Sequence, residues 1–142
     1  MKQNVMIEIN SRIESGGEVE KIDVTTRGHR LIKDGVTHLS YKETDQNGYD
    51  GNSVLLKIDG EKQVTINRMG SARSQMVIET GVRRQMSYQT PFGATVMGIT
   101  GGAIRIYKEN QSQNIEVNYE LDINQELISK NHLLIKVKES AN

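Results

Sequence analysis

Few residues in this chain could do chemistry, and they do not form a known catalytic motif. The 142 residues include three histidines, His29, His38 and His132, and no cysteine. The absence of cysteine excludes a thiol nucleophile and a cysteine-ligated zinc. No H-E-x-x-H spacing occurs, G-x-S-x-G is absent, and no spacing selects a serine triad. The sequence therefore predicts no metal and no cofactor. An enzyme is not excluded but has no positive support.

The histidines are also predicted to lie apart. If Asp34–Gly35 forms a two-residue turn, position 29 pairs with Ser40 and position 38 pairs with Leu31. His29 and His38 are then not cross-strand partners. His132 is expected in a turn. All three are interpreted as surface residues.

A glycine-rich stretch, "SYQTPFGATVMGITGG" at 87–102, contains the only proline and the only phenylalanine of the chain. It has no lysine and so does not match a phosphate-binding P-loop, and it is not a G-x-G-x-x-G motif. Proline cannot donate to a strand ladder, so Pro91 is expected at a strand end. Glycines suit positions where a strand coils sharply to close a barrel. We interpret the stretch as a corner of the fold.

The best candidates for a site are polar residues that share a face with apolar ones. Glu43 is in phase with Leu39 and Tyr41, and Arg68 is in phase with Val64 and Ile66. In the strand before Pro91, Tyr88 and Thr90 are in phase with Val82 and Met86, and this phase also allows Arg84. An unpaired charge inside a fold is costly, so these groups must pair with each other or face a wet cavity. Three interpretations stay open: strand ends at the rim, a structural ion pair, or a pocket for a small ligand.

The elements that position these residues are predicted to be strands. Valine and isoleucine total 26 residues against 12 for alanine and leucine, and β-branched side chains favour strands. Apolar residues alternate with polar ones from Val5 to Val137, with turn residues between the runs. An odd-length loop is required at 59–63, a bulge at Gly28 is allowed, and 124–131 is expected to form a helical turn or wide bend. The pattern predicts a single domain over 1–142, an all-β up-and-down antiparallel barrel of eight to ten strands with few or no helices.

Composition excludes several classes of partner. The chain has 18 basic and 18 acidic residues and no basic run, so nucleic acid is not expected to bind. No signal peptide and no apolar run of membrane-spanning length is present, so a cytoplasmic protein without membrane contact is expected.

Five segments carry a resemblance to a known family: "LSYKET" (39–44), "VTINRMG" (64–70), "QMVIETG" (75–81), "YQTPFG" (88–93) and "NYELDI" (118–123). In order and spacing the chain resembles the small bacterial YwiB-type family, a domain of unknown function. The resemblance implies a calycin-like barrel, related in shape to lipocalins and fatty-acid-binding proteins. It also marks a set of positions: Tyr41, Glu43, Arg68, Gly70, Met76, Tyr88, Thr90, Gly93 and Tyr119.

These observations lead to two main hypotheses. In the first, the barrel binds a small polar or amphipathic ligand through Tyr41, Glu43, Arg68, Met76, Tyr88 and Thr90. In the second, the barrel is filled and acts as an interaction module or homodimer without ligand or catalysis. An open cavity around Glu43 and Arg68 favours the first hypothesis. A core packed with Met76, Met86 and Met97 favours the second.

Overall fold

A computed structural model describes residues 2–43, 52–70, 73–90 and 93–140, and for residues 88–90 it describes the backbone but not the side chains. The described residues form ten strands and contain no helix long and apolar enough to cross a membrane. The strands are β1 (Gln3–Ser15), β2 (Glu18–Lys33), β3 (Val36–Lys42), β4 (Ser53–Asp59), β5 (Gln63–Met69), β6 (Ser74–Glu79), β7 (Arg83–Thr90), β8 (Gly93–Glu109), β9 (Ser112–Ile123) and β10 (Glu126–Glu139).

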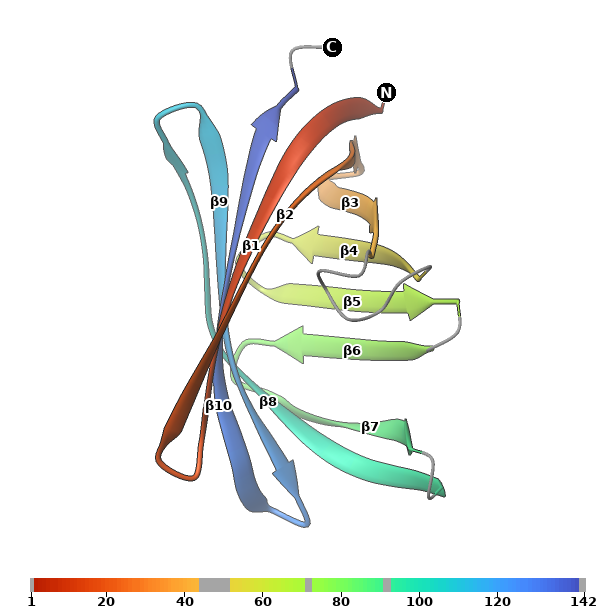
Figure 1. The fold of residues 1–142 in the computed structure, drawn as a ribbon, viewed down its shortest axis with the longest axis vertical. Helices are drawn as coiled ribbons and strands as arrows, with labels where there is room; N and C mark the ends of the chain where they lie inside the picture. The colour runs from red at the N-terminus through yellow and green to blue at the C-terminus, as the bar shows by residue number, and fades with distance from the viewer. Residues whose placement is uncertain (1, 44–51, 71–72, 91–92, 141–142) are drawn as a thin grey trace.

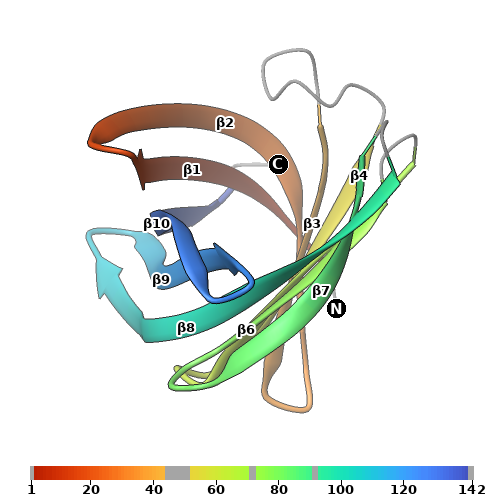
Figure 2. The same cartoon turned by 90° about the horizontal axis from the view of Figure 1, so that it is seen from below.

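The strands make one antiparallel sheet that curls into a nearly closed barrel (Figures 1 and 2). Their order is β6-β5-β4-β3-β2-β1-β10-β9-β8-β7, so every neighbour is also a sequence neighbour except the pair of β1 and β10. The first and last strands pair over most of their length, and the start of β1 and the end of β10 lie on the same side of the barrel (Figure 1). The prediction of an up-and-down barrel with eight to ten strands is confirmed.

The barrel has a seam between β6 and β7, the two ends of the strand order. The two strands meet only where a tight turn joins them. There Gly81 N donates to Gly101 O (2.9 Å) and Gly101 N donates to Val82 O (3.1 Å). A side chain at position 101 would overlap the backbone carbonyl of Glu79, so glycine allows the close approach that closes this point. Beyond the turn, β6 and β7 diverge (Figure 1).

Two long strands carry the sheet from one side of the barrel to the other. β2 pairs with β1 through its first part and with β3 through its last part. β8 pairs with β7 through its first part and with β9 through its last part. The register of β8 against β9 shifts between Gly101 and Ile104. A strand bends at such an irregularity, so the corner predicted for the glycine-rich stretch lies at this point of β8. Pro91 and Phe92 fall outside the described residues.

The turns match the predicted pattern in two places and differ in two others. Asp34 and Gly35 form the two-residue turn, both with positive φ, and a three-residue loop joins Asp59 to Gln63. The bulge allowed at Gly28 does not form, because the register is unbroken and the glycine instead makes room for the Ser40 carbonyl and the Ile7 side chain. The helical turn or bend expected at 124–131 is wrong, because only Asn124 and Gln125 turn. Both adopt positive φ, which glycine favours, so the sequence signal for a tight turn is weak there.

The core is aliphatic and comes from the inward face of nearly every strand. Ile7, Leu39, Val64, Val117 and Ile135 are among the fully buried side chains, each in phase with the alternation of its own strand. Met76 and Met86 pack partly buried against this core, whereas Met97 does not belong to it. The barrel is therefore packed through most of its length, and polar side chains reach the interior at few positions.

Candidate binding site inside the barrel

Three neighbouring strands position the candidate site. On β3, β4 and β5, Tyr41 faces Val54 and Val54 faces Arg68 across the ladders, so all three side chains point to the interior. Glu43 follows β3 by one residue, and its backbone N–H donates to the carbonyl of Asn52 (2.8 Å). This bond extends the strand pairing by one step. The Glu43 side chain is thereby held on the inward face, two residues beyond Tyr41.

Glu43 and Arg68 form an ion pair inside the barrel. The Nε of Arg68 donates to Oε1 of Glu43 at 2.9 Å. The Glu43 side chain is 2% exposed and that of Arg68 is 28% exposed. The carboxylate is therefore desolvated while the guanidinium keeps some access to water. The predicted meeting of these two residues is confirmed, and a placement of Glu43 at the solvated rim is excluded.

Two tyrosines lie in the field of this pair. Burial raises the pKa of Tyr41 to about 12, with Arg68 lowering it and Glu43 raising it by smaller amounts. Burial also raises the pKa of Tyr119, and Arg68 again opposes that rise. Tyr119 lies on β9, on the opposite side of the barrel from β5. The guanidinium of Arg68 thus acts on phenols from both sides of the interior, and both phenols stay neutral at physiological pH.

A cavity of about 160 Å³ lies beside these groups. Aliphatic side chains form most of its wall, and Arg68, the two tyrosines and two serines supply the polar part. The lining residues are Ile9, Ser11, Tyr41, Leu56, Ile66, Arg68, Ser74, Met76, Tyr119, Leu133 and Ile135. An apolar cavity with a few convergent polar groups is the usual form of a small-molecule site. Its volume is, however, below the roughly 300–1,000 Å³ of most such sites.

The predicted site residues are only partly brought together. Tyr41, Arg68 and Met76 line the cavity, and Glu43 holds Arg68. The side chains of Tyr88 and Thr90 lie outside the part of the chain whose side chains are described, so their role stays a prediction. The interior placement allowed for Arg84 is wrong, because its side chain is 46% exposed. It is paired with Glu79 at the seam.

Reasoning from the residues alone did not select three polar residues of the cavity wall, Ser11, Ser74 and Tyr119. Ser11 and Ser74 are small polar residues at inward positions, and nothing in their type distinguishes them from surface serines. Tyr119 had a usable signal, since it is in phase with Ile115 and Val117 in the most regular alternation of the chain. It was marked only by the family resemblance.

The histidines take no part in this site. His29 pairs with Ser40 and His38 pairs with Leu31, so their predicted separation is confirmed. His132 was expected in a turn, but it lies within β10, opposite Arg12. No group of three or more potential ligands that could hold a metal ion occurs in the described part of the chain.

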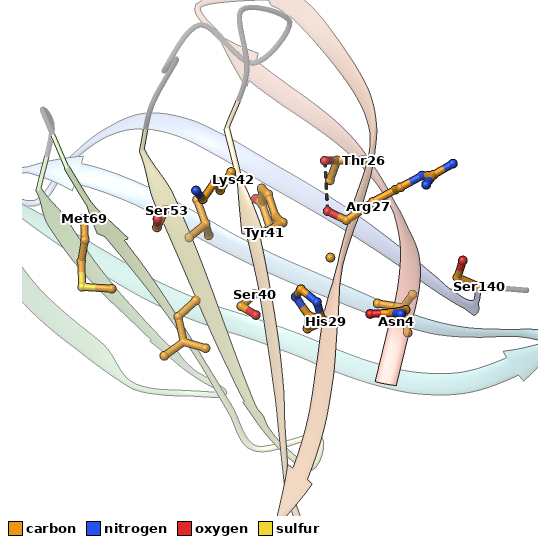
Figure 3. Close-up of a pocket in the computed structure, with 14 residues that line it drawn as sticks. Asn4, Thr26, Arg27, His29, Ser40, Tyr41, Lys42, Ser53, Met69 and Ser140 are labelled. Atoms are coloured by element: carbon orange, nitrogen blue, oxygen red, sulfur yellow. Dashed lines mark hydrogen bonds between the residues drawn. The ribbon is translucent and has the colours of Figure 1, made fainter. Parts of the chain in front are cut away.

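Two other hollows are larger but are less suited to a specific site. A groove of about 780 Å³ runs over β2, β3 and β4 and contains the positive side chains of Arg27 and Lys42 (Figure 3). Arg27 extends away from His29 and Ser40, and Lys42 lies toward another side of the groove, so the positive charges do not converge (Figure 3). The other hollow, of about 540 Å³, lies along the seam.

Comparison with known proteins finds a matching family, a curated relative and a crystal structure with a similar fold. The model of a domain of unknown function, DUF1934, matches residues 7–135. A curated relative, the uncharacterized β-barrel protein YwiB of Bacillus subtilis, is 24% identical over 128 residues, which cover 89% of this chain and 88% of the relative. The crystal structure of the YwiB protein superposes with a TM-score of 0.81 at 18% identity, covering 99% of this chain and 94% of that one. These similarities support the fold and leave the activity open.

Proposed function

The chain belongs to the DUF1934 family of β-barrel proteins of unknown function, and we propose that it is a cytoplasmic binding protein that holds a small polar or amphipathic ligand inside its barrel. One observation carries the proposal: a mainly aliphatic interior contains a cavity whose wall includes Arg68 and two partly buried tyrosines. The tyrosine rings also pack against the core, but the guanidinium and the two hydroxyls add polar groups to it. They are the kind that orients a ligand by hydrogen bonds and charge.

The cavity sets limits on the ligand. A volume of about 160 Å³ equals the liquid volume of roughly five water molecules, so the ligand is small. A fatty-acid chain does not fit such a space. Glu43 neutralises part of the charge of Arg68, so a neutral polar group or a single anionic group beside an apolar body fits the wall best.

The polar end of this ligand is expected to lie against Arg68 and the hydroxyls of Tyr41 and Tyr119. Each of these side chains can donate a hydrogen bond, and both phenols remain protonated. The apolar end is expected against Leu56, Ile66 and the neighbouring aliphatic wall. Catalysis is not required by this arrangement, since no nucleophile–base pair faces the cavity among the described residues.

The test is native mass spectrometry of freshly purified protein, compared with its Ser11→Val variant. Ser11 lines the cavity, and valine adds apolar volume there without adding charge. A co-purifying mass that is present on the wild type and lost on the variant supports the proposal. Arg27→Gln in the outer groove is the matched control and should keep the mass. A wild type that carries no mass and binds no member of a small-metabolite library by ligand-observed NMR refutes the proposal.

The second hypothesis, a filled barrel that acts through its surface, is favoured by a different observation. Aliphatic side chains fill most of the interior, and the cavity is small for a dedicated binding protein. Under this hypothesis, filling the cavity by Ser11→Val leaves partner binding unchanged and raises the free energy of unfolding, because a void is removed.

A further inference from the structure

The first ten residues of β2 have a partner on only one side. β2 pairs with β1 from Glu18 to Arg30, but β3 pairs only with Gly28–Lys33. Glu18–Arg27 therefore forms an open strand edge, which lies along the free side of the β1–β2 hairpin (Figures 1 and 2). An open edge presents a row of backbone donors and acceptors that another strand can pair with.

β6 and β7 also have one open side each, and those two sides border the seam. Of the two long strands that change neighbours along their length, β8 is bridged on its uncovered part, whereas β2 is not bridged by any described residue. β8 pairs with β7 only as far as Thr100, so its later residues also lack a strand on that side. There the side chain of Glu61, in the β4–β5 turn, accepts a hydrogen bond from the backbone of Ile106 (2.8 Å). For Glu18–Arg27, no described residue from another element makes a comparable contact with the open backbone.

We propose that this edge binds a second copy of the chain, with the two β2 strands antiparallel about a two-fold axis at Ile22. Such an axis pairs residues of equal parity, because paired side chains in a continuous sheet point to the same face. Around Ile22, Lys21 of each copy faces Asp23 of the other, and Val19 faces Thr25. The two copies together form one sheet that continues across the axis.

The charges select this register. Moving the axis by one residue to position 21 places Lys21 opposite Lys21, and moving it to position 23 places Asp23 opposite Asp23. Like charges directly opposite each other destabilise a strand pair, while opposite charges stabilise it. The register centred on Ile22 is therefore the only one of the three with two favourable charge pairs.

Within one copy, contacts with β1 orient Lys21 and Asp23 for pairing with the second copy. Asn10 donates to Asp23 (2.7 Å) and holds the carboxylate in place. Lys21 lies opposite Arg12 on β1, so repulsion favours a lysine conformation that leans toward the open edge. Ile22 and Val19 are 40% and 47% exposed. Pairing would cover both side chains and add an apolar contribution to the charge pairs.

The test combines two charge reversals and measures mass in solution by analytical ultracentrifugation. Wild-type protein at about 100 µM is expected to be a dimer. Lys21→Glu and Asp23→Lys each turn two attractive contacts into repulsive ones, so each variant should dissociate at least about tenfold more readily. Lys57→Glu, the same change on a strand paired on both sides, is the control and should leave the dimer intact.

The decisive measurement mixes the two variants. Lys21→Glu chains carry two acids and Asp23→Lys chains carry two lysines, so a mixture restores both attractive contacts and should form a heterodimer. Circular dichroism checks that each variant is folded, and Asp23→Asn, which keeps an acceptor for Asn10, replaces Asp23→Lys in the homodimer measurement if that chain does not fold. A monomeric wild type, or reversals that leave its mass unchanged, overturns the inference. So does a mixture of folded variants that stays monomeric. None of these results depends on a ligand in the barrel.

Discussion

The ion pair between Arg68 and Glu43 allows a quantitative test of how the interior is built. The perturbation is Arg68→Met, which keeps an unbranched apolar stem but removes the guanidinium and its charge. It leaves a carboxylate that is 2% exposed without its 2.9 Å partner. Removing one member of a buried pair costs about 3–5 kcal/mol. Because the Arg68 side chain is 28% exposed, we expect a cost at or just below the lower limit of that range, about 2–3 kcal/mol.

The assay is urea denaturation at neutral pH, completed as a double-mutant cycle with Glu43→Gln. A loss of about 2–3 kcal/mol corresponds to a midpoint shift of roughly 1 M when the urea dependence is about 2 kcal/mol per molar. Glutamine has nearly the shape of glutamate and can still accept a hydrogen bond. The double variant should therefore be more stable than the sum of the single effects predicts, with a coupling above about 1 kcal/mol.

Arg84 provides the matched control, because the same substitution there breaks an exposed ion pair. The Nε of Arg84 lies 3.2 Å from Glu79 Oε1, and the arginine side chain is 46% exposed. The cycle of Arg84→Met with Glu79→Gln should give a coupling of about 0–0.5 kcal/mol. If both cycles give the same coupling, or if the Glu43–Arg68 cycle is additive, then burial does not strengthen the inner pair and the reasoning about the interior is refuted.

Three further predictions concern other parts of the barrel. The pKa of Tyr41 is about 12 in the folded chain and near 10 in the unfolded chain, so above pH 10 the unfolded state ionises first and stability falls, by about 2.3 kcal/mol at pH 12. Tyr41→Phe should flatten this alkaline loss in pH-dependent denaturation, and parallel curves for the two proteins would contradict the shift. Gly101→Ala should lower the free energy of unfolding by about 1–3 kcal/mol, because the new Cβ overlaps the Glu79 carbonyl. Gly102→Ala, whose Cβ would lie 3.2 Å from the nearest Asn118 atom, should lower the free energy of unfolding by less than Gly101→Ala in thermal denaturation. A larger loss for Gly102→Ala would contradict the close approach at Gly101. Gln125→Gly should raise the free energy of unfolding by a few tenths of a kcal/mol up to about 1 kcal/mol, since Gln125 has φ 69°, and an unchanged thermal midpoint would count against strain in that turn.

Local patterns in the sequence were sufficient to predict the strands and their inward faces. A strand repeats every two residues, so the phase of Val64 and Ile66 also places Arg68, and the phase of Leu39 and Tyr41 places Glu43. The Asp34–Gly35 turn set the register of its hairpin and separated His29 from His38. The turn at Asn124–Gln125 was not predicted, because glutamine, unlike asparagine, is not a signal for positive φ and no glycine follows Asn124. The missed turn also put His132 in the wrong element.

Only the tertiary structure decided which inward groups meet and which segments stay uncovered. Phase says that a side chain points inside, but closure of the sheet determines that Tyr119 of β9 lies across the cavity from Arg68 of β5. The same closure leaves Arg84 at an open seam, although its phase is that of an interior residue. The open edge of β2 is likewise invisible in the sequence, because it arises from the difference in length between β2 and the strand beside it. Alternation is a property of a single strand. Cavities, seams and open edges depend instead on how many residues of each strand are paired with a neighbouring strand.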